Sequence, residues 1–253
     1  MNFKKNIIST LGLLLLLFAS CDIIPENERI LDMEKVDVKK NVLLLDFTDQ
    51  FCVNCAEAAE IVDTLLEAYN PNLIAVSIHA SPISLPLVTK EGKEYDTYFK
   101  INYTHPSAVV DGLGNYTAEQ FRGAVLSRIK ETTSVQVEIK ASFEELSKIR
   151  IETNVSNPEL IQGLTLQLWI VEDSIVDYQK MQDYTENNYI HRHVFRTSVN
   201  GTWGESIAIQ EETQFTYLQE LSDKWEKSQV HIVGFVRKSN NEVLDVKQTS
   251  IDY

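Results

Sequence analysis

The sequence has few cysteines. Only three occur among its 253 residues, and two of them, Cys52 and Cys55, form a single Cys-x-x-Cys pair. No second pair exists to complete a four-cysteine zinc site. Zinc held by Cys52, Cys55 and two histidines is the alternative that the composition leaves open, but we expect no metal and no other cofactor.

The sequence is also short of positive charge. Its 23 lysines and arginines are outnumbered by 37 aspartates and glutamates, which gives a formal net charge of -14. This balance argues against nucleic acid and anionic lipid as binding partners. With 43% hydrophobic residues the chain can bury real cores, and its length suffices for two ordinary domains.

The first apolar run is shorter than a membrane span. Residues 1–20 have a basic start, an apolar core from Ile7 to Phe18 and small residues before Cys21, which is the pattern of an export signal. An uncleaved membrane helix would need about 20 apolar residues. Residues 21–40 carry many charges and are expected to form a tether.

The end of this segment, Leu17-Phe18-Ala19-Ser20-Cys21, resembles a bacterial lipobox, although Phe18 replaces the usual aliphatic residue. The resemblance implies that Cys21 is lipidated and anchors the mature chain to a membrane. A plain secretory peptide with a free Cys21 thiol is the alternative. In both cases the body of the protein is exported to a compartment where disulfide chemistry is possible.

The cysteine pair lies where a strand pattern gives way to a helix pattern. Val42–Thr48 is short, apolar and continuous, as in a buried strand, and residues 56–69 have helix formers up to the stop at Asn70-Pro71. Cys52 is therefore expected at or near a helix N-terminus, where unpaired N–H groups favour a thiolate. Cys55, on the same helical face, could resolve a mixed disulfide formed at Cys52.

The next segments continue a strand and helix order. Leu73–His79 is a second buried strand, so residues 42–79 predict a βαβ unit. A helix is expected near Lys90–Phe99, a short strand within residues 105–112, and a capped helix from Thr117 to about Glu131.

Two of these segments carry a family resemblance. Asp46-Phe47-Thr48-Asp49-Gln50-Phe51-Cys52-Val53-Asn54-Cys55 resembles the active-site segment of the thioredoxin superfamily, and Thr104-His105-Pro106 resembles its cis-proline element. The resemblance implies that Cys52 is the nucleophile, that Cys55 resolves, and that Asp46 is a buried acid that moves protons for the resolving thiol. The dipeptide Val53-Asn54 and the long 80–104 insertion depart from thioredoxin itself.

The same resemblance implies a substrate-binding edge made by Phe51, His105 and Pro106. A cis Pro106 would leave the neighbouring backbone free to pair with a substrate chain. It would also turn His105 toward Cys52, where an imidazolium would lower the thiol pKa. The alternative is that His105 is a surface loop residue before an ordinary trans proline.

Beyond residue 133 the hydrophobic pattern changes to strict alternation. Val135–Lys140, Ile149–Val155 and Leu164–Ile170 alternate apolar and polar residues, as antiparallel strands do, and later runs near residues 231–236 and 242–249 repeat the pattern. His191 and His193 are two residues apart, so on one strand they would share a face and could hold a metal. Without a third ligand nearby, we favour ordinary roles for both.

We therefore expect an α/β thioredoxin-like domain over residues 41–132, followed by an all-β immunoglobulin-like sandwich domain over residues 133–253. The order of lipobox, Cys-x-x-Cys, Tyr-Ile-His-x-His-Val and Gly-x-Trp-Gly resembles the outer membrane protein 28 family of Gram-negative lipoproteins. That resemblance covers the mature chain and implies an outer-membrane lipoprotein of the cell envelope, anchored by lipid on Cys21.

Thiol-disulfide exchange with protein thiols or disulfides of the envelope is the leading functional hypothesis. The second is a binding or adhesion lipoprotein that uses the thioredoxin-like domain as a scaffold, without redox catalysis. A peroxidase or a cytochrome-assembly reductase is a third possibility, and no residue selects its substrate.

Overall fold

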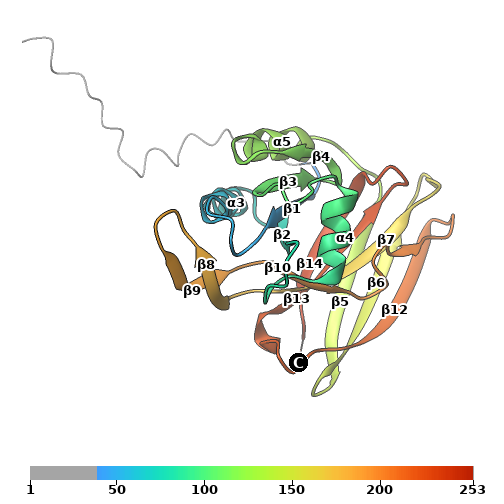
Figure 1. Cartoon of the computed structure of the whole chain (residues 1–253). Coiled ribbons are helices and arrows are strands. Elements are labelled where there is room, and N and C mark those ends of the chain that lie inside the picture. The colour runs from blue at the N-terminus through green and yellow to red at the C-terminus, as the bar shows by residue number, and fades with distance from the viewer. Residues whose placement is uncertain (1–38, 253) are drawn as a thin grey trace, which may run out of the picture. The chain divides into compact units, whose positions relative to one another are not determined.

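The computed structural model describes residues 39–252, which belong to one compact unit (Figure 1). The export signal, the tether up to residue 38 and the proposed lipidation site Cys21 lie outside these residues. No helix within residues 39–252 has the length and apolar character needed to cross a membrane.

The first half of the described chain contains a parallel strand pair joined by a helix. Strand β1 (Val42–Thr48) leads to α3 (Cys55–Tyr69), and β2 (Leu73–His79) returns parallel to β1. Every residue of β1 is buried, which explains its continuous apolar sequence.

The connection that follows β2 contains helix α4 (Lys90–Tyr98), whose N-cap Thr89 accepts a hydrogen bond from the Gly92 amide. Two short strands then add an antiparallel edge next to β1, namely β3 (Ser107–Val110) and β4 (Leu113–Tyr116). A short 3₁₀ turn, η1 (Ala118–Gln120), and helix α5 (Phe121–Ile129) complete this half. The expected boundary at residue 132 falls between α5 and the next strand.

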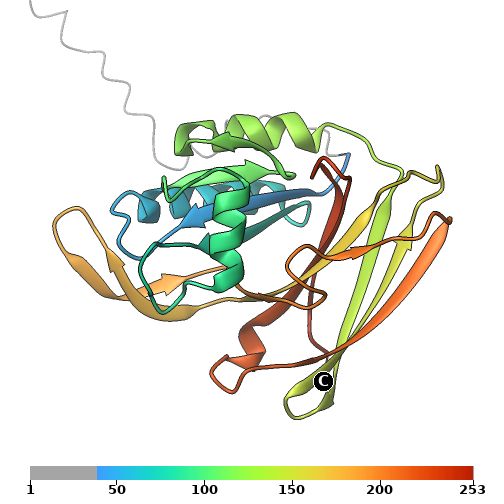
Figure 2. The same cartoon turned by 45° about the vertical axis from the view of Figure 1, so that its right-hand side comes forward.

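The second half is built from strands. They are β5 (Gln136–Glu145), β6 (Lys148–Ser156), β7 (Thr165–Glu172), β8 (Ile175–Lys180), β9 (Thr185–His191), β10 (Val194–Ser198), β11 (Glu205–Ser206), β12 (Glu212–Glu220), β13 (Val230–Arg237) and β14 (Val243–Ser250), with a 3₁₀ turn η2 (Lys227–Gln229) before β13. Strands β12, β6 and β5 form a three-stranded sheet, and β8 pairs with β9 as a hairpin. Figure 2 shows this hairpin projecting from the rest of the unit.

The predicted fold class is wrong, because the strands of the two halves form one sheet. Nine of the described strands belong to a mixed sheet with the order β14-β13-β7-β10-β2-β1-β3-β4, and β11 also pairs with β7. The link is the parallel pairing of Val194 in β10 with Ser77 in β2. The described residues are mostly strand with three short helices, so they form neither a distinct α/β thioredoxin-like domain nor a separate immunoglobulin-like sandwich.

Two hydrophobic cores follow from this sheet. One joins the three-stranded sheet to β7 and β13, with Ile149, Ile151, Leu168 and Ile232 among its buried members. The other lies under α4, where Tyr95 packs with side chains from both halves: Leu43, Leu45, Phe47, Trp169, Phe195 and Phe235. The second core therefore draws on both halves, whereas the buried members of the first all lie within residues 135–251.

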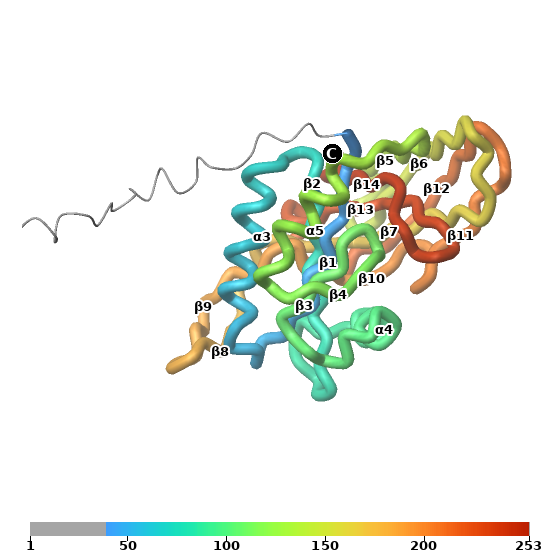
Figure 3. Tube along the Cα trace, turned by 90° about the horizontal axis from the view of Figure 1, so that it is seen from above, coloured from blue at the N-terminus to red at the C-terminus, as the bar shows by residue number. Residues whose placement is uncertain are grey.

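The alternation along β1 separates two faces of the sheet. Leu43, Leu45 and Phe47 point into the core beneath α4. Asp46 and Thr48 point to the opposite face, where they line a cavity with residues of α3. Figure 3, a view from above, shows α3 and α4 on different sides of β1.

Candidate functional site

The cysteine pair stands at the end of β1, before the first turn of α3. Cys52 and Cys55 are joined by a disulfide, with their Cα atoms 5.4 Å apart. Cys52 is half-buried, whereas Cys55 is buried. Helix α3 begins at Cys55 with Asn54 as N-cap, so Cys52 precedes the helix rather than forming part of it.

Residues from both halves hold the loop that carries Cys52. Within the loop, the Phe51 amide donates to Asp49 Oδ1 at 2.6 Å. From the hairpin, Gln179 Nε2 donates to the carbonyl of Cys52 at 2.9 Å, and the Lys180 amide donates to the carbonyl of Gln50 at 2.8 Å. The β8–β9 hairpin therefore forms one wall of the site.

Phe51 is the most exposed aromatic side chain beside the cysteines. It is 53% exposed, and its ring meets that of Tyr178 edge to face, with the ring centres 5.8 Å apart. The position agrees with the substrate contact that the sequence predicts for Phe51. That contact stays a prediction.

On the other side of the site, the His105–Pro106 peptide bond is cis, as the resemblance implied. The His105 ring is buried between two carboxylates: Nε2 lies 3.0 Å from Asp96 Oδ2, and Nδ1 lies 3.5 Å from Asp49 Oδ2. Burial works to lower the pKa of His105, but Asp49 and Asp96 outweigh it and raise the pKa to about 8.

His105 is thus linked to the cysteine loop through Asp49. Burial would raise the pKa of Asp49, but hydrogen bonds from His105 and from the Phe51 amide lower it. The pair His105–Asp49 is therefore charged at neutral pH. A direct effect of His105 on the Cys52 thiol stays a prediction.

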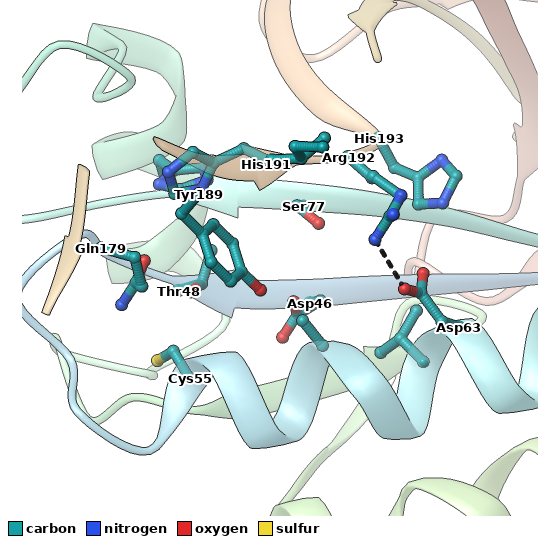
Figure 4. A pocket seen from close by; sticks show the side chains of 14 residues that line it. Asp46, Thr48, Cys55, Asp63, Ser77, Gln179, Tyr189, His191, Arg192 and His193 are labelled. Carbon is teal, nitrogen blue, oxygen red and sulfur yellow. Dashed lines mark hydrogen bonds and ion pairs between the residues drawn. The ribbon is translucent and has the colours of Figure 1, made fainter. Parts of the chain in front are cut away.

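Asp46 lies in a small cavity behind Cys55. It is 2% exposed, and burial raises the pKa of its carboxyl to about 7, against the opposing charges of His105 and His193. The cavity measures about 30 Å³ and is also lined by Cys55, Ser77, His79 and Tyr189. Figure 4 shows Cys55 and Asp46 on one side of this space and Tyr189 of β9 on the other.

The two histidines considered as metal ligands do not share a strand face. Strand β9 ends at His191, whose buried ring contacts His79 with ring centres 5.2 Å apart. His193 lies beyond that end with a positive φ, and its Nδ1 lies 3.1 Å from Asp173 Oδ1. Within residues 39–252 no cluster of three or more His, Cys, Asp or Glu side chains could hold a metal ion.

Several site residues were not predicted from the sequence. Gln179 of β8 reaches the cysteine loop and Asp96 of α4 reaches His105, and no local motif marks either of them. His79 gives a weak signal, because it is a polar side chain at the carboxyl end of a buried strand parallel to β1, where sites of parallel sheets usually lie.

The arrangement has the parts that thiol-disulfide exchange needs. A half-buried Cys52 faces the outside, a buried Cys55 lies behind it, and a carboxyl group that titrates near neutral pH lines the same cavity as Cys55. Such a carboxyl group can take up the proton of a resolving thiol.

Comparisons with known proteins agree with one family. The family model described as "Outer membrane protein Omp28" matches residues 92–253. The chain is similar in structure to HBP35 of Porphyromonas gingivalis, with a TM-score of 0.64 and 17% identity over 86% of this chain and 77% of that one, which shows a shared fold.

A domain of the outer membrane lipoprotein Omp28 from Porphyromonas gingivalis is 20% identical to this chain. The match covers 48% of this chain and 91% of that one, with a TM-score of 0.38. No curated protein matches the chain.

Proposed function

The chain belongs to the Omp28 family and is an outer-membrane lipoprotein of the Gram-negative cell envelope, and we propose that it carries out thiol-disulfide exchange on exported proteins. The observation that carries the proposal is the pairing of a half-buried Cys52 with a buried Cys55 that shares a cavity with Asp46. The lipid on Cys21 is the proposed membrane anchor.

The first proposed step is the attack of the Cys52 thiolate on a substrate disulfide. A bond forms between Cys52 Sγ and one substrate sulfur, and the other substrate sulfur leaves as a thiolate that takes a proton from water. Phe51, His105 and Pro106 are the proposed contacts for the substrate chain. The exposed ring of Phe51 supports a role in holding apolar side chains next to the substrate cysteine.

The second step is resolution by Cys55. Its thiol gives a proton to the Asp46 carboxylate, and the resulting thiolate attacks Cys52 Sγ. The Cys52–Cys55 disulfide forms, and the substrate sulfur leaves as a second thiolate that becomes a thiol. The substrate gains two electrons and the protein loses two, and the reverse sequence would oxidise a substrate dithiol.

The reduction potential of the Cys52–Cys55 couple tests the proposal. The full-length protein in detergent would be equilibrated in glutathione buffers, and the fraction of the disulfide measured. A potential of about -120 to -270 mV, the range of exchange proteins, is expected. A value below about -300 mV, typical of structural disulfides, would refute the proposal.

A trapping experiment in cells gives an independent test. Cys55→Ala removes the resolving thiol, so envelope proteins should accumulate as mixed disulfides with Cys52. The variant with both cysteines changed to alanine is the matched control and should trap none. Equal recovery of partners by the two variants would contradict exchange at Cys52.

The second candidate function, a binding lipoprotein without redox catalysis, is supported by the outer face of the β8–β9 hairpin. Val176 and Ile190 pair across the two strands and are both exposed, Val176 at 61%. Contiguous exposed apolar side chains can mark a surface that binds another protein. In that case Cys52→Ser would leave partner binding unchanged, and the disulfide would be structural.

A further inference from the structure

The strand register places two polar side chains above the same cavity. Asp46 pairs with Ser77, and Thr48 pairs with His79 on the neighbouring strand. Directly paired residues point to the same face of a sheet, as do residues two apart along a strand. Asp46 and His79 are therefore diagonal neighbours on the face that α3 covers, and both line the cavity that Cys55 also lines.

Each of these two side chains has an unpaired polar atom. Asp46 Oδ1 and His79 Nδ1 are buried and have no hydrogen-bond partner within residues 39–252, and the residues are 2% and 3% exposed. Buried polar atoms in native proteins almost always bond to protein or to ordered water. A cavity needs about 10 to 15 Å³ to hold one water, and this one measures about 30 Å³.

We propose that Asp46 and His79 share ordered water in this cavity, and that His79 is a positioning residue that holds this water for proton transfer between Cys55 and Asp46. This inference rests on the proposed exchange at Cys52 and Cys55. It assigns to His79 a role in the resolving step, and it explains why a histidine is buried beside His191 with one ring nitrogen unpaired.

The state of His79 fits this role. Burial, followed by the charges of His191, His105 and Arg196, lowers the pKa of His79 well below its ordinary value, so the ring is neutral at physiological pH. A neutral imidazole has one donor and one acceptor nitrogen and can orient a water without competing for the proton. The carboxylate of Asp46 stays the stronger base.

The charged and titratable groups around Asp46 come from four elements. They are Cys55 and Asp63 of α3, His79 of β2, Tyr189 and His191 of β9, and Arg192 and His193 beyond β9. His105 acts on Asp46 from the cis-proline loop. Arg192 is paired with Asp63 at 2.9 Å and His193 with Asp173, whereas His79 Nδ1 has no hydrogen-bond partner among the described residues.

In the proposed transfer, the Cys55 S–H bond breaks and its proton passes to a cavity water, which gives one of its own protons to the Asp46 carboxylate. The Cys55 thiolate then attacks Cys52 Sγ, and the group bound to Cys52 leaves as a thiolate. No oxidant beyond the disulfide bound at Cys52 is needed. In the reverse direction the same water returns the proton.

The resolving step can be isolated with an aryl disulfide that releases coloured nitrothiobenzoate. The reduced full-length protein releases one coloured thiolate when Cys52 is modified and a second when Cys55 attacks, and the rate of the second release is measured from about pH 5 to about pH 9. We expect the wild-type rate to rise with a midpoint near 7, where Asp46 ionises.

His79→Phe keeps a flat ring but removes the nitrogen that holds the water. The Asp46 carboxylate loses solvation, so the midpoint should rise by about one pH unit, and the rate at pH 7 should fall about fivefold. His79→Asn keeps a polar group in the cavity and should restore the wild-type profile. Leu218→Phe, which introduces the same side chain on the exposed surface of β12, should leave the profile unchanged.

The role of His79 would be overturned if folded His79→Phe kept the wild-type pH profile of the second release. It would also be overturned if the midpoint of His79→Asn rose as much as that of His79→Phe. Either result leaves the reduction potential and the trapping result intact, so it is distinguishable from failure of the proposed exchange. A crystal structure of the wild-type protein tests the inference without any variant. Water between Asp46 Oδ1 and His79 Nδ1 supports it, and a dry cavity overturns it.

Discussion

Replacing Asp46 with asparagine should stabilise the protein, and the gain should depend on pH. The pKa of Asp46 is raised by burial to about 7 in the folded chain, against an ordinary value of 3.8. Between these values the folded chain binds more protons than the unfolded chain, so stability falls as the pH rises. Below pH 3.8 the carboxyl group is neutral in the folded and the unfolded chain, so it does not lower the stability of the fold.

The size of the effect follows from the two pKa values. Each pH unit between 3.8 and about 7 corresponds to about 1.4 kcal/mol, so ionised Asp46 costs the folded state about 4 kcal/mol above pH 7. Asparagine has nearly the same shape and never ionises. Asp46→Asn should therefore raise the free energy of unfolding by up to about 4 kcal/mol at pH 8 and by little at pH 4.

Urea unfolding at several pH values, with the Cys52–Cys55 disulfide intact in both proteins, measures this difference. Asp223→Asn, the same substitution on the exposed surface, is the control and should change stability by the same small amount at each pH. If the gain from Asp46→Asn were equal at pH 4 and pH 8, ionisation of Asp46 would not be its cause, and the reasoning from burial would be refuted.

Three further predictions concern the walls of the site and the turn after β3. The pKa of His105 is raised from 6.5 to about 8, so its stabilisation of the folded state is complete below pH 6.5 and is lost as the pH rises through 8. His105→Gln should therefore lower the free energy of unfolding by about 2 kcal/mol at pH 6 and by much less at pH 9, as measured by urea unfolding. Gly112 has a φ of 72° and no room for a Cβ, so Gly112→Ala should lower the free energy of unfolding by more than about 1 kcal/mol. Gly123 lies in α5 with open space around it, so Gly123→Ala should raise the free energy of unfolding by about 0.5 to 1 kcal/mol. Gln179→Ala removes the hydrogen bond to the Cys52 carbonyl and should speed reduction of the Cys52–Cys55 disulfide by dithiothreitol. The control Gln214→Ala, at an exposed position, should not change that rate. Equal reduction rates for the two variants would show that the hairpin does not hold the loop.

The local elements could be predicted because local signals determine them. Strand β1 is apolar except for Asp46 and Thr48 because both of its faces are covered, and α3 ends where Asn70-Pro71 removes the next helical hydrogen bond. The cysteine spacing and the aspartate on β1 predicted the residues that line the centre of the candidate site. The alternation after residue 133 predicted β5 and β6, because each has one face on a core. Strand β7 was predicted from the same alternation, although its two faces are buried in two different cores.

The joining of the halves could not be predicted in the same way. It depends on the pairing of Val194 with Ser77, which is a contact between distant backbones and leaves no periodic signal. The predicted thioredoxin-like and immunoglobulin-like domains failed at this pairing, because each assumed that its own sheet was complete. Gln179 was missed for a related reason, because it lies 127 residues from Cys52 along the chain. Asp96 is only 9 residues from His105, but no local motif in α4 marks it as a partner of that histidine.

The hairpin that walls the cysteine loop also sets an order of events during export. Gln179 follows Cys52 by 127 residues, so a chain that crosses the inner membrane from its N-terminus delivers both cysteines to the periplasm well before their wall. During that interval the hairpin does not yet cover the two cysteines, so oxidants and thiols of the compartment can react with them.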